Sequence, residues 1–127
     1  MNVDTSRKSE LVAIVDDDES IRNALLGLLK VSGFQAVAFA SAEEFLISGA
    51  QNKIACLIAD IRMPGMSGLE LQAKLNNDHC RIPIIFITAQ GDEKMRMQAL
   101  RSGAVEFLAK PYDDEVLLDS VRAAISS

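Results

Sequence analysis

The sequence has few residues of the kinds that build metal centres or disulfide-bonded folds. Its 127 residues include two cysteines, one histidine and no tryptophan, and aromatic residues make up only 5% of the chain. Cys56 and Cys80 form neither a CxxC pair nor a cluster with His79, which disfavours a zinc site and a disulfide framework. We therefore expect free thiols, an exposed loop histidine and an aliphatic core.

Long apolar runs are also absent. Runs such as residues 84–87 are far shorter than the ~18 residues that suggest a membrane span, and residues 1–10 are polar, without the apolar stretch of a secretory signal. The formal net charge of −5 disfavours binding to nucleic acid by this segment, because phosphate contacts need clustered Lys and Arg. We expect a cytoplasmic protein with one domain over residues 11–127, after a polar lead-in, and no membrane contact.

Five short apolar runs alternate with five segments of helical periodicity. The runs are the expected strands, at residues 11–15, 35–39, 55–59, 84–88 and 105–109. Four of them are apolar nearly throughout, which is typical of parallel strands covered by helices on both faces. The second is more polar and is typical of an edge strand. The alternation predicts an α/β fold of successive βα units around a parallel sheet.

The helices have recognisable starts and apolar stripes. Apolar side chains recur at helical spacing over residues 21–29. Residues 41–44 and residues 67–70 each have a Ser-x-x-Glu pattern, which satisfies free amides at a helix start. A fourth helix is expected over about residues 92–102 and a fifth around residues 117–125.

Polar side chains end or directly follow four of the expected strands. These residues are Asp16, Asp17, Asp60, Thr88 and Lys110. The carboxyl ends of the strands form the binding crevice of an open α/β sheet, so the five side chains are expected to converge. Taken singly, each has an ordinary structural interpretation, such as a loop residue or a helix cap like Asp18. Their joint occurrence favours a functional site.

The residue types of this cluster indicate phosphoryl chemistry. Two carboxylates ~4 Å apart repel by about 4 kcal/mol at an effective dielectric near 20, so the aspartates imply a cation. All the ligands are hard oxygens, which favours Mg²⁺. A carboxylate can act as a nucleophile toward a phosphoryl group, while Lys110 and the Thr88 hydroxyl would neutralise and position the transferring oxygens.

Four motifs in the sequence resemble the receiver domain family of two-component response regulators. They are Ile-Val-Asp-Asp-Asp at residues 14–18, Asp-Ile-Arg-Met-Pro-Gly-Met-Ser-Gly at 60–68, Ile-Thr-Ala at 87–89 and Lys-Pro at 110–111. The resemblance covers roughly residues 11–125, and residues 102–112 are similar to the FixJ-type branch. It implies a doubly wound, flavodoxin-like sheet of five parallel strands in the order 2-1-3-4-5, with two helices on one face and three on the other.

The resemblance also implies the roles of the site residues. Asp60 is the expected phosphoacceptor. Asp17, Asp60 and the backbone carbonyl of Arg62 are the expected Mg²⁺ ligands, and Asp16 is expected to act mainly through a bound water. Thr88 and Lys110 would hold phosphoryl oxygens.

Three further features follow from the same resemblance. Ala89 keeps the access route open by being small. Phe107 matches the family's switch aromatic, which changes rotamer when the hydroxyl of Thr88 moves toward the phosphate. A cis peptide bond is expected between Lys110 and Pro111.

The partners are likewise those of the family. A sensor histidine kinase would donate the phosphoryl group, and phosphorylation would favour a homodimer through the surface of the fourth helix, fifth strand and fifth helix. The output is expected to be transcriptional, and DNA would be contacted only through an effector domain absent from this chain. The chain would then be a signalling domain that catalyses only its own phosphorylation and dephosphorylation, rather than an enzyme.

Three alternatives stay open at this point. A phosphatase of the haloacid dehalogenase type would need a threonine in its Asp-x-Asp-x-Thr pattern, which residues 16–20 lack. A flavodoxin-like FMN carrier would have its flavin phosphate repelled by the acids after the first strand. A receiver that binds partners without accepting phosphate would not need Asp60, Thr88 and Lys110 together.

Overall fold

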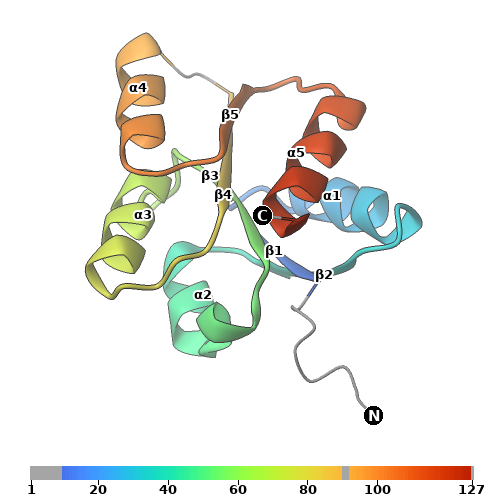
Figure 1. Cartoon of the computed structure of the whole chain (residues 1–127), viewed down its shortest axis with the longest axis horizontal. Helices are drawn as coiled ribbons and strands as arrows, with labels where there is room; N and C mark the ends of the chain where they lie inside the picture. The colour runs from blue at the N-terminus through green and yellow to red at the C-terminus, as the bar shows by residue number, and fades with distance from the viewer. Residues whose placement is uncertain (1–9, 90–91, 127) are drawn as a thin grey trace.

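The first strand, β1, lies inside a five-stranded parallel sheet whose order is β2-β1-β3-β4-β5 (Figure 1). This computed structural model describes residues 10–89 and 92–126. The strands are β1 (Leu11–Val15), β2 (Gln35–Phe39), β3 (Cys56–Asp60), β4 (Ile84–Thr88) and β5 (Glu106–Ala109). The predicted order is therefore confirmed, and β2 is an edge strand as its polarity indicated.

Helices connect consecutive strands and a last helix follows β5. They are α1 (Glu19–Val31), α2 (Ala42–Ser48), the short 3-10 helix η2 (Ala50–Lys53), α3 (Gly68–Asn77), α4 (Glu93–Arg101) and α5 (Asp114–Ser126). Among the residues described, no helix has the length and apolar character needed to cross a membrane. The expected polar lead-in over residues 1–10 lies outside the described part of the chain, apart from Glu10.

Two strands differ from the sequence prediction, β3 by one residue at both ends and β5 by one residue at its start. β3 begins at Cys56 and includes Asp60, because Asp60 still pairs in register with Ile87 of β4. β5 begins at Glu106, one residue later than expected. The phosphoacceptor candidate is thus the last residue of the central strand rather than the first residue of the following loop, and the sheet's hydrogen bonds fix its backbone.

The two faces of the sheet carry separate apolar cores. Alternate residues of a strand point to opposite faces, so Val12 and Ile14 pack in one cluster with α1 and α5, whereas Ala13 and Val15 pack in the other with α2, α3 and α4. Figure 1 shows this division, with α1 and α5 on one side of the strands and the other three helices opposite. The two-and-three arrangement of helices agrees with the predicted fold.

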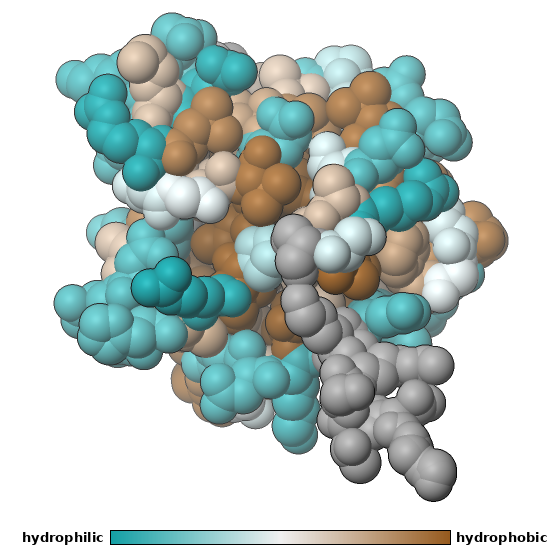
Figure 2. All heavy atoms as spheres, in the orientation of Figure 1, coloured by the Kyte–Doolittle hydropathy of each residue, from teal (hydrophilic) through white to brown (hydrophobic). Residues whose placement is uncertain are grey.

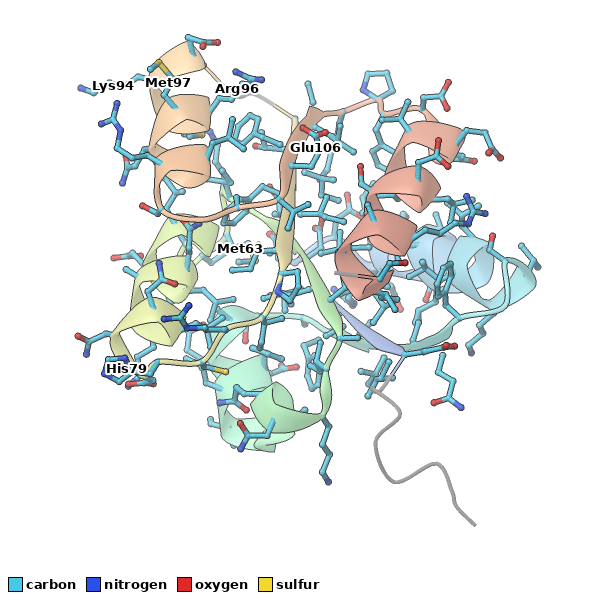
Figure 3. All side chains as sticks on the ribbon, in the orientation of Figure 1. Met63, His79, Lys94, Arg96, Met97 and Glu106 are labelled. Carbon is cyan, nitrogen blue, oxygen red and sulfur yellow. The ribbon has the colours of Figure 1, made fainter. Side chains whose placement is uncertain are left out.

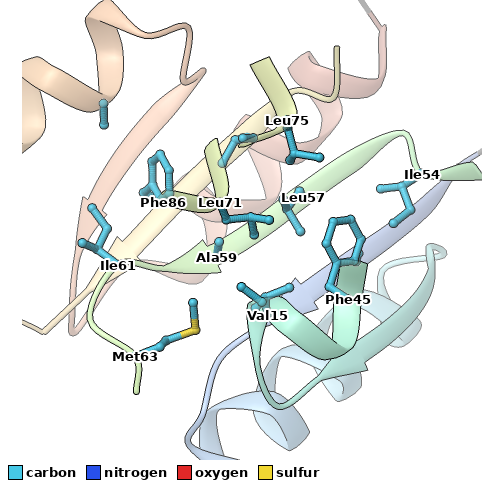
Figure 4. Close-up of a cluster of buried hydrophobic side chains, with 14 residues drawn as sticks. Val15, Phe45, Ile54, Leu57, Ala59, Ile61, Met63, Leu71, Leu75 and Phe86 are labelled. Atoms are coloured by element: carbon cyan, nitrogen blue, oxygen red, sulfur yellow. The ribbon is translucent and has the colours of Figure 1, made fainter. Parts of the chain in front are cut away.

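The core under α2 is centred on an aromatic anchor. Phe45 is fully buried and lies among Val15, Leu57 and Leu71 (Figure 4). Its ring meets that of Phe39 edge to face, with centroids 5.5 Å apart and an interplanar angle of 69°, a geometry that contributes roughly 0.5–1.5 kcal/mol beyond burial. This packing fixes a seven-residue helix that would be unstable alone.

The helix starts are capped as their sequences predict. Ser67 and Glu70 form a reciprocal capping box. The amide of Glu70 donates to the Ser67 hydroxyl at 3.1 Å, and the amide of Ser67 donates to the Glu70 carboxylate at 2.8 Å. Asp18 accepts from the amide of Ser20 at 2.8 Å and so caps α1. Asp92 caps α4 with a bond of 2.7 Å. Asp18 is therefore a structural cap, which separates it from its two acidic neighbours.

Helix α4 is attached to the body mainly near its C-terminal end. Gln72 of α3 is buried and donates to the carbonyl of Ala99, and Asn76, one turn later, donates to the carbonyl of Ser102, both at 3.0 Å. Ala99 is the buried residue of α4.

On the face shown in Figure 2, apolar side chains gather between the helices in the middle of the molecule, and polar side chains cover the rim.

Candidate functional site

Three aspartates meet at the carboxyl ends of β1 and β3. One carboxylate oxygen from each of Asp16, Asp17 and Asp60 lies within 4.8 Å of the other two. Asp16 is 0% exposed and Asp60 6% exposed, whereas Asp17 is open to solvent. The strand order reverses around β1, which is where open α/β sheets bind their ligands. The predicted convergence of the strand-end acids is present in the structure.

Lys110, which directly follows β5, completes the cluster. Its Nζ lies 3.2 Å from Oδ2 of Asp16 and 3.0 Å from Oδ2 of Asp60. Its backbone amide donates to the carbonyl of Thr88 at 2.8 Å, and its peptide bond to Pro111 is cis. One ammonium group thus bridges two buried carboxylates.

Burial and neighbouring charges shift the pKa values of Asp16 and Lys110. Desolvation raises the pKa of Asp16 above its ordinary value, and the charge of Asp60 adds to this, although the Asp18 amide and Lys110 act in the opposite direction. Burial alone would lower the pKa of Lys110. The hydrogen bond to Asp60 and the charges of both aspartates outweigh burial and raise that pKa. Lys110 is therefore a permanent cation at neutral pH.

Backbone and side-chain donors orient the aspartates. The amide of Asp18 donates to Oδ1 of Asp16 at 2.9 Å, and Nη1 of Arg22 donates to the carbonyl of Asp16 at 2.9 Å. The amide of Arg62 donates to Oδ1 of Asp60 at 3.3 Å. These bonds fix one oxygen of each buried carboxylate by a backbone amide and the other by Lys110.

Thr88 ends β4 beside this cluster. Its side chain is 0% exposed, and within the described part of the chain its hydroxyl has no hydrogen-bond partner. A buried hydroxyl without a partner is costly, and an incoming ligand oxygen would relieve that cost. Ala89 follows in an exposed position, and Phe107 is half-buried against the core that contains Phe86.

The donor set fits a magnesium ion and a phosphoryl group. The acids supply hard carboxylate oxygens with one side open to solvent, which suits an ion that retains waters and binds phosphate oxygens. The Lys110 ammonium and the Thr88 hydroxyl supply donors for anionic oxygens. Asp16, Asp17 and Asp60 are the acids whose oxygens lie close enough together to hold such an ion.

Residues 12–122 match the family model of the response regulator receiver domain. The chain belongs to this family. Nodulation protein W of Bradyrhizobium diazoefficiens is 46% identical over 114 residues, covering 90% of this chain and 50% of that protein. This receiver domain therefore spans about half the length of the curated relatives it matches.

Solved structures place the receiver in the FixJ-type branch. The structure described as FixJ-N has a TM-score of 0.85 at 38% identity, covering 94% of this chain and 95% of that one. The response regulator StyR has a TM-score of 0.86 at 44% identity, covering 91% of this chain and 59% of that one.

Sequence reasoning missed one side chain close to the receiver's β3–α3 loop. The carboxylate of Glu43, in the first turn of α2, accepts a hydrogen bond of 2.8 Å from the amide of Met66, 23 residues away. Glu43 lies beside the Ser-x-x-Glu cap of its helix, and in the sequence it looks like an ordinary exposed acid of a first helical turn. Only the fold brings it to the loop.

The described part of the receiver has hollows near two different ends of the sheet. One of about 480 Å³ adjoins the β3–α3 loop and is lined by Ile61, Met63, Leu69 and Met95 among others. The other, of about 580 Å³, lies at the opposite edge of the sheet, near His79 at the end of α3 (Figure 3). The basic residues that line this second hollow, such as Arg81 and Arg101, lie at or just after the C-terminal ends of α3 and α4. Cations at these positions stabilise the helix dipole, so their presence has a structural explanation.

Proposed function

We propose that this receiver accepts a phosphoryl group from a sensor histidine kinase on Asp60, in a reaction that requires Mg²⁺. The observation that carries the proposal is the bridging of Asp16 and Asp60 by Lys110 within the acid cluster. Lys110 holds a cation beside the Asp60 carboxylate, where it can offset part of the negative charge that develops on the phosphoryl oxygens during transfer.

The chemistry is an in-line displacement at phosphorus. A carboxylate oxygen of Asp60 forms the new P–O bond, while the P–N bond of the kinase phosphohistidine breaks and its electron pair returns to the imidazole. Lys110 then stabilises one phosphoryl oxygen, and the Thr88 hydroxyl donates to another. The backbone amide of Arg62 keeps Asp60 oriented through the displacement.

Magnesium, when bound, supplies the positive charge that lets an anionic donor approach three acids. Asp17, Asp60 and the Arg62 carbonyl are the proposed direct ligands. Asp16 is the proposed ligand through water, since its Oδ1 already accepts the Asp18 amide and its Oδ2 the Lys110 ammonium. Ala89, small and exposed, leaves the approach to Asp60 open.

Phosphorylation is proposed to act as a population shift. The Thr88 hydroxyl moves toward the phosphoryl group, and Phe107 changes rotamer into the space that is released. The α4–β5–α5 surface then favours a homodimer. Exposed apolar side chains at Met97 and Val105 support this choice of surface, and Figure 3 shows Met97 and Lys94 on the side of α4 away from the sheet.

The setting of the reaction is proposed from the relatives. FixJ of Rhizobium meliloti is a transcriptional regulatory protein, so residues 11–127 are proposed to be the receiver part of a cytoplasmic transcription regulator that contacts DNA through a separate effector domain. The receiver itself catalyses only its own phosphorylation and dephosphorylation.

The direct test is phosphorylation with acetyl phosphate or a phosphorylated kinase, followed by mass spectrometry. One phosphoryl group is expected per chain in Mg²⁺, and none after chelation. Asp60→Asn removes the nucleophile and should abolish the adduct, whereas Asp18→Asn alters a cap and should retain it. A full adduct on the Asp60→Asn protein would overturn the assignment.

A further inference from the structure

We propose that Glu43 is a positioning residue for the phosphoryl-transfer site, because its carboxylate fixes the loop that carries the backbone carbonyl of Arg62. The inference rests on the proposed function of that site. It assigns a role to a side chain of α2, a helix that contributes no residue to the acid cluster.

The loop between β3 and α3 is held at both ends. At its start, the amide of Arg62 donates to Asp60 at 3.3 Å, and the carbonyl of Ile61 accepts from the amide of Gly68 at 2.9 Å. At its far end, the amide of Met66 donates to Oε2 of Glu43 at 2.8 Å. Among these bonds, the one to Glu43 ties the loop to a different βα unit.

The loop backbone at Gly65 leaves space for the Glu43 carboxylate. Gly65 has a φ of 75°, a conformation that side chains rarely adopt, and a Cβ at this position would overlap the Glu43 carboxylate. Gly65 therefore admits the carboxylate to the loop backbone. A hydrogen bond from an amide to an ionised carboxylate is roughly twice as strong as a neutral one.

The helix that presents Glu43 is anchored by a buried side chain and by its N-terminal cap. Phe45, two residues further, is fully buried, and Ser41 caps the helix start with a bond of 3.0 Å to the amide of Glu44. The anchored helix, the short bond to a charged acceptor and the close fit at Gly65 together restrict the loop. Because a backbone carbonyl binds a metal only where the backbone holds it, loss of the Glu43 bond should weaken Mg²⁺ binding without touching a ligand.

The experiment compares Glu43→Ala with Glu43→Gln, whose side-chain carbonyl can still accept from Met66 while the charge is gone. Mg²⁺ dissociation constants of the unphosphorylated protein are measured by following amide chemical shifts in a titration. Glu43→Ala is expected to weaken binding by about tenfold, the low end of the range for groups that support metal ligands. Glu43→Gln keeps the acceptor but loses the extra strength that the charge gives the bond, so it is expected to weaken binding less, by about twofold to threefold.

Glu44→Gln is the matched control, since it removes the same charge from the next position of the same helix while its side-chain carbonyl can still accept from the amide of Ala40. It should leave the Mg²⁺ dissociation constant close to that of the parent. Equal losses in Glu43→Ala, Glu43→Gln and Glu44→Gln would show that net charge alone matters and would overturn the positioning role.

A second readout separates positioning from general damage. With acetyl phosphate, Glu43→Ala should be phosphorylated slowly at limiting Mg²⁺ and at nearly the parental rate at saturating Mg²⁺. A rate that stays low at saturation would contradict the inference. If the parent neither binds Mg²⁺ nor is phosphorylated, the proposed function itself fails; if the parent does both and Glu43→Ala matches it, only the role of Glu43 is wrong.

Discussion

Lys110 and Asp60 lie 50 residues apart in the sequence, and their side chains meet at 3.0 Å. The same ammonium group is 3.2 Å from Asp16. This lysine therefore pairs with two carboxylates that the fold has buried side by side and offsets part of their charge, so it contributes both to the stability of the fold and to the chemistry of the site.

Replacing Lys110 by Met should destabilise the metal-free protein. Removing one partner of a buried ion pair costs about 3–5 kcal/mol, and because the Lys110 side chain is 17% exposed we expect a smaller loss of about 1–3 kcal/mol, discounted for solvent screening. Urea unfolding at neutral pH measures it. Lys94→Met, at an exposed position of α4, is the control and should change the free energy of unfolding little. A Lys110→Met protein as stable as its parent would show that the bridge contributes nothing.

Replacing Asp16 by Asn should stabilise the metal-free protein at neutral pH. The pKa of Asp16 is raised in the folded state above 3.8, chiefly by burial, so the folded state binds this proton more tightly than the unfolded state does. The free energy of unfolding therefore falls as pH rises from the unfolded pKa through the folded pKa, and the whole penalty is present above both.

Denaturant melts of Asp16→Asn and its parent across this pH range test the sign. The advantage of the Asn variant should grow with rising pH and be lost when Mg²⁺ is added, because the ion stabilises the parent's charged form. An Asn variant that is less stable than the parent at neutral pH would mean that the ion pair with Lys110 outweighs desolvation.

The sequence was sufficient to predict which residues form the chemical cluster, because strand ends in a parallel sheet lie at one edge whatever the helices do. Asp16, Asp60 and Lys110 needed only the strand order to be brought together. The bond from Glu43 to Met66 could not be predicted in this way. It depends on the reach of one side chain between two units that each have a local explanation of their own.

The same distinction applies to α3 and α4. Gln72 and Asn76 look like ordinary polar residues of a helix, and their bonds to the end of α4 depend on the distance between two helices, which periodicity does not contain. The boundary of β3 was displaced for a related reason, since pairing with β4 continues through Asp60. A polar residue after an apolar run marks a change of chemistry and need not mark the end of a strand.

Replacing Gly68 by Ala should disturb the phosphoacceptor directly. A Cβ at this position would overlap the backbone carbonyl of Asp60 and press on the Cα of Ile61, so the start of α3 or the end of β3 must move. Overpacking of this kind costs about 1–3 kcal/mol, and the rate of phosphorylation should fall with it.

Gly27→Ala provides the control for this change. Gly27 lies in α1, where an added Cβ would meet nothing within 4 Å, and the substitution should stabilise the helix by roughly 0.5–1 kcal/mol. Urea melts and labelling rates of the two variants give the comparison. Normal stability and labelling in Gly68→Ala would show that the close approach at Asp60 is relieved at no cost.

Replacing Val105 by Glu should prevent the phosphorylation-dependent dimer while leaving phosphorylation intact. Val105 is 41% exposed and precedes β5, so a charge there would be buried at the proposed interface without a partner. Sedimentation of the phosphorylated proteins measures the effect. Val31→Glu, at an 85% exposed position that ends α1, should still dimerise; a dimer in Val105→Glu would place the interface elsewhere.

Because Cys56 is buried, the rate at which its thiol is alkylated reports how often the sheet opens. Burial raises the pKa of its thiol to about 12, and β3 is flanked by β1 and β4, so alkylating reagents can reach this sulfur only when the sheet comes apart. Cys80 is partly exposed and should react first. Because Cys56 and Asp60 are the two ends of one strand, any ion or phosphoryl group that stabilises the folded state at Asp60 should lengthen the time before Cys56 is modified.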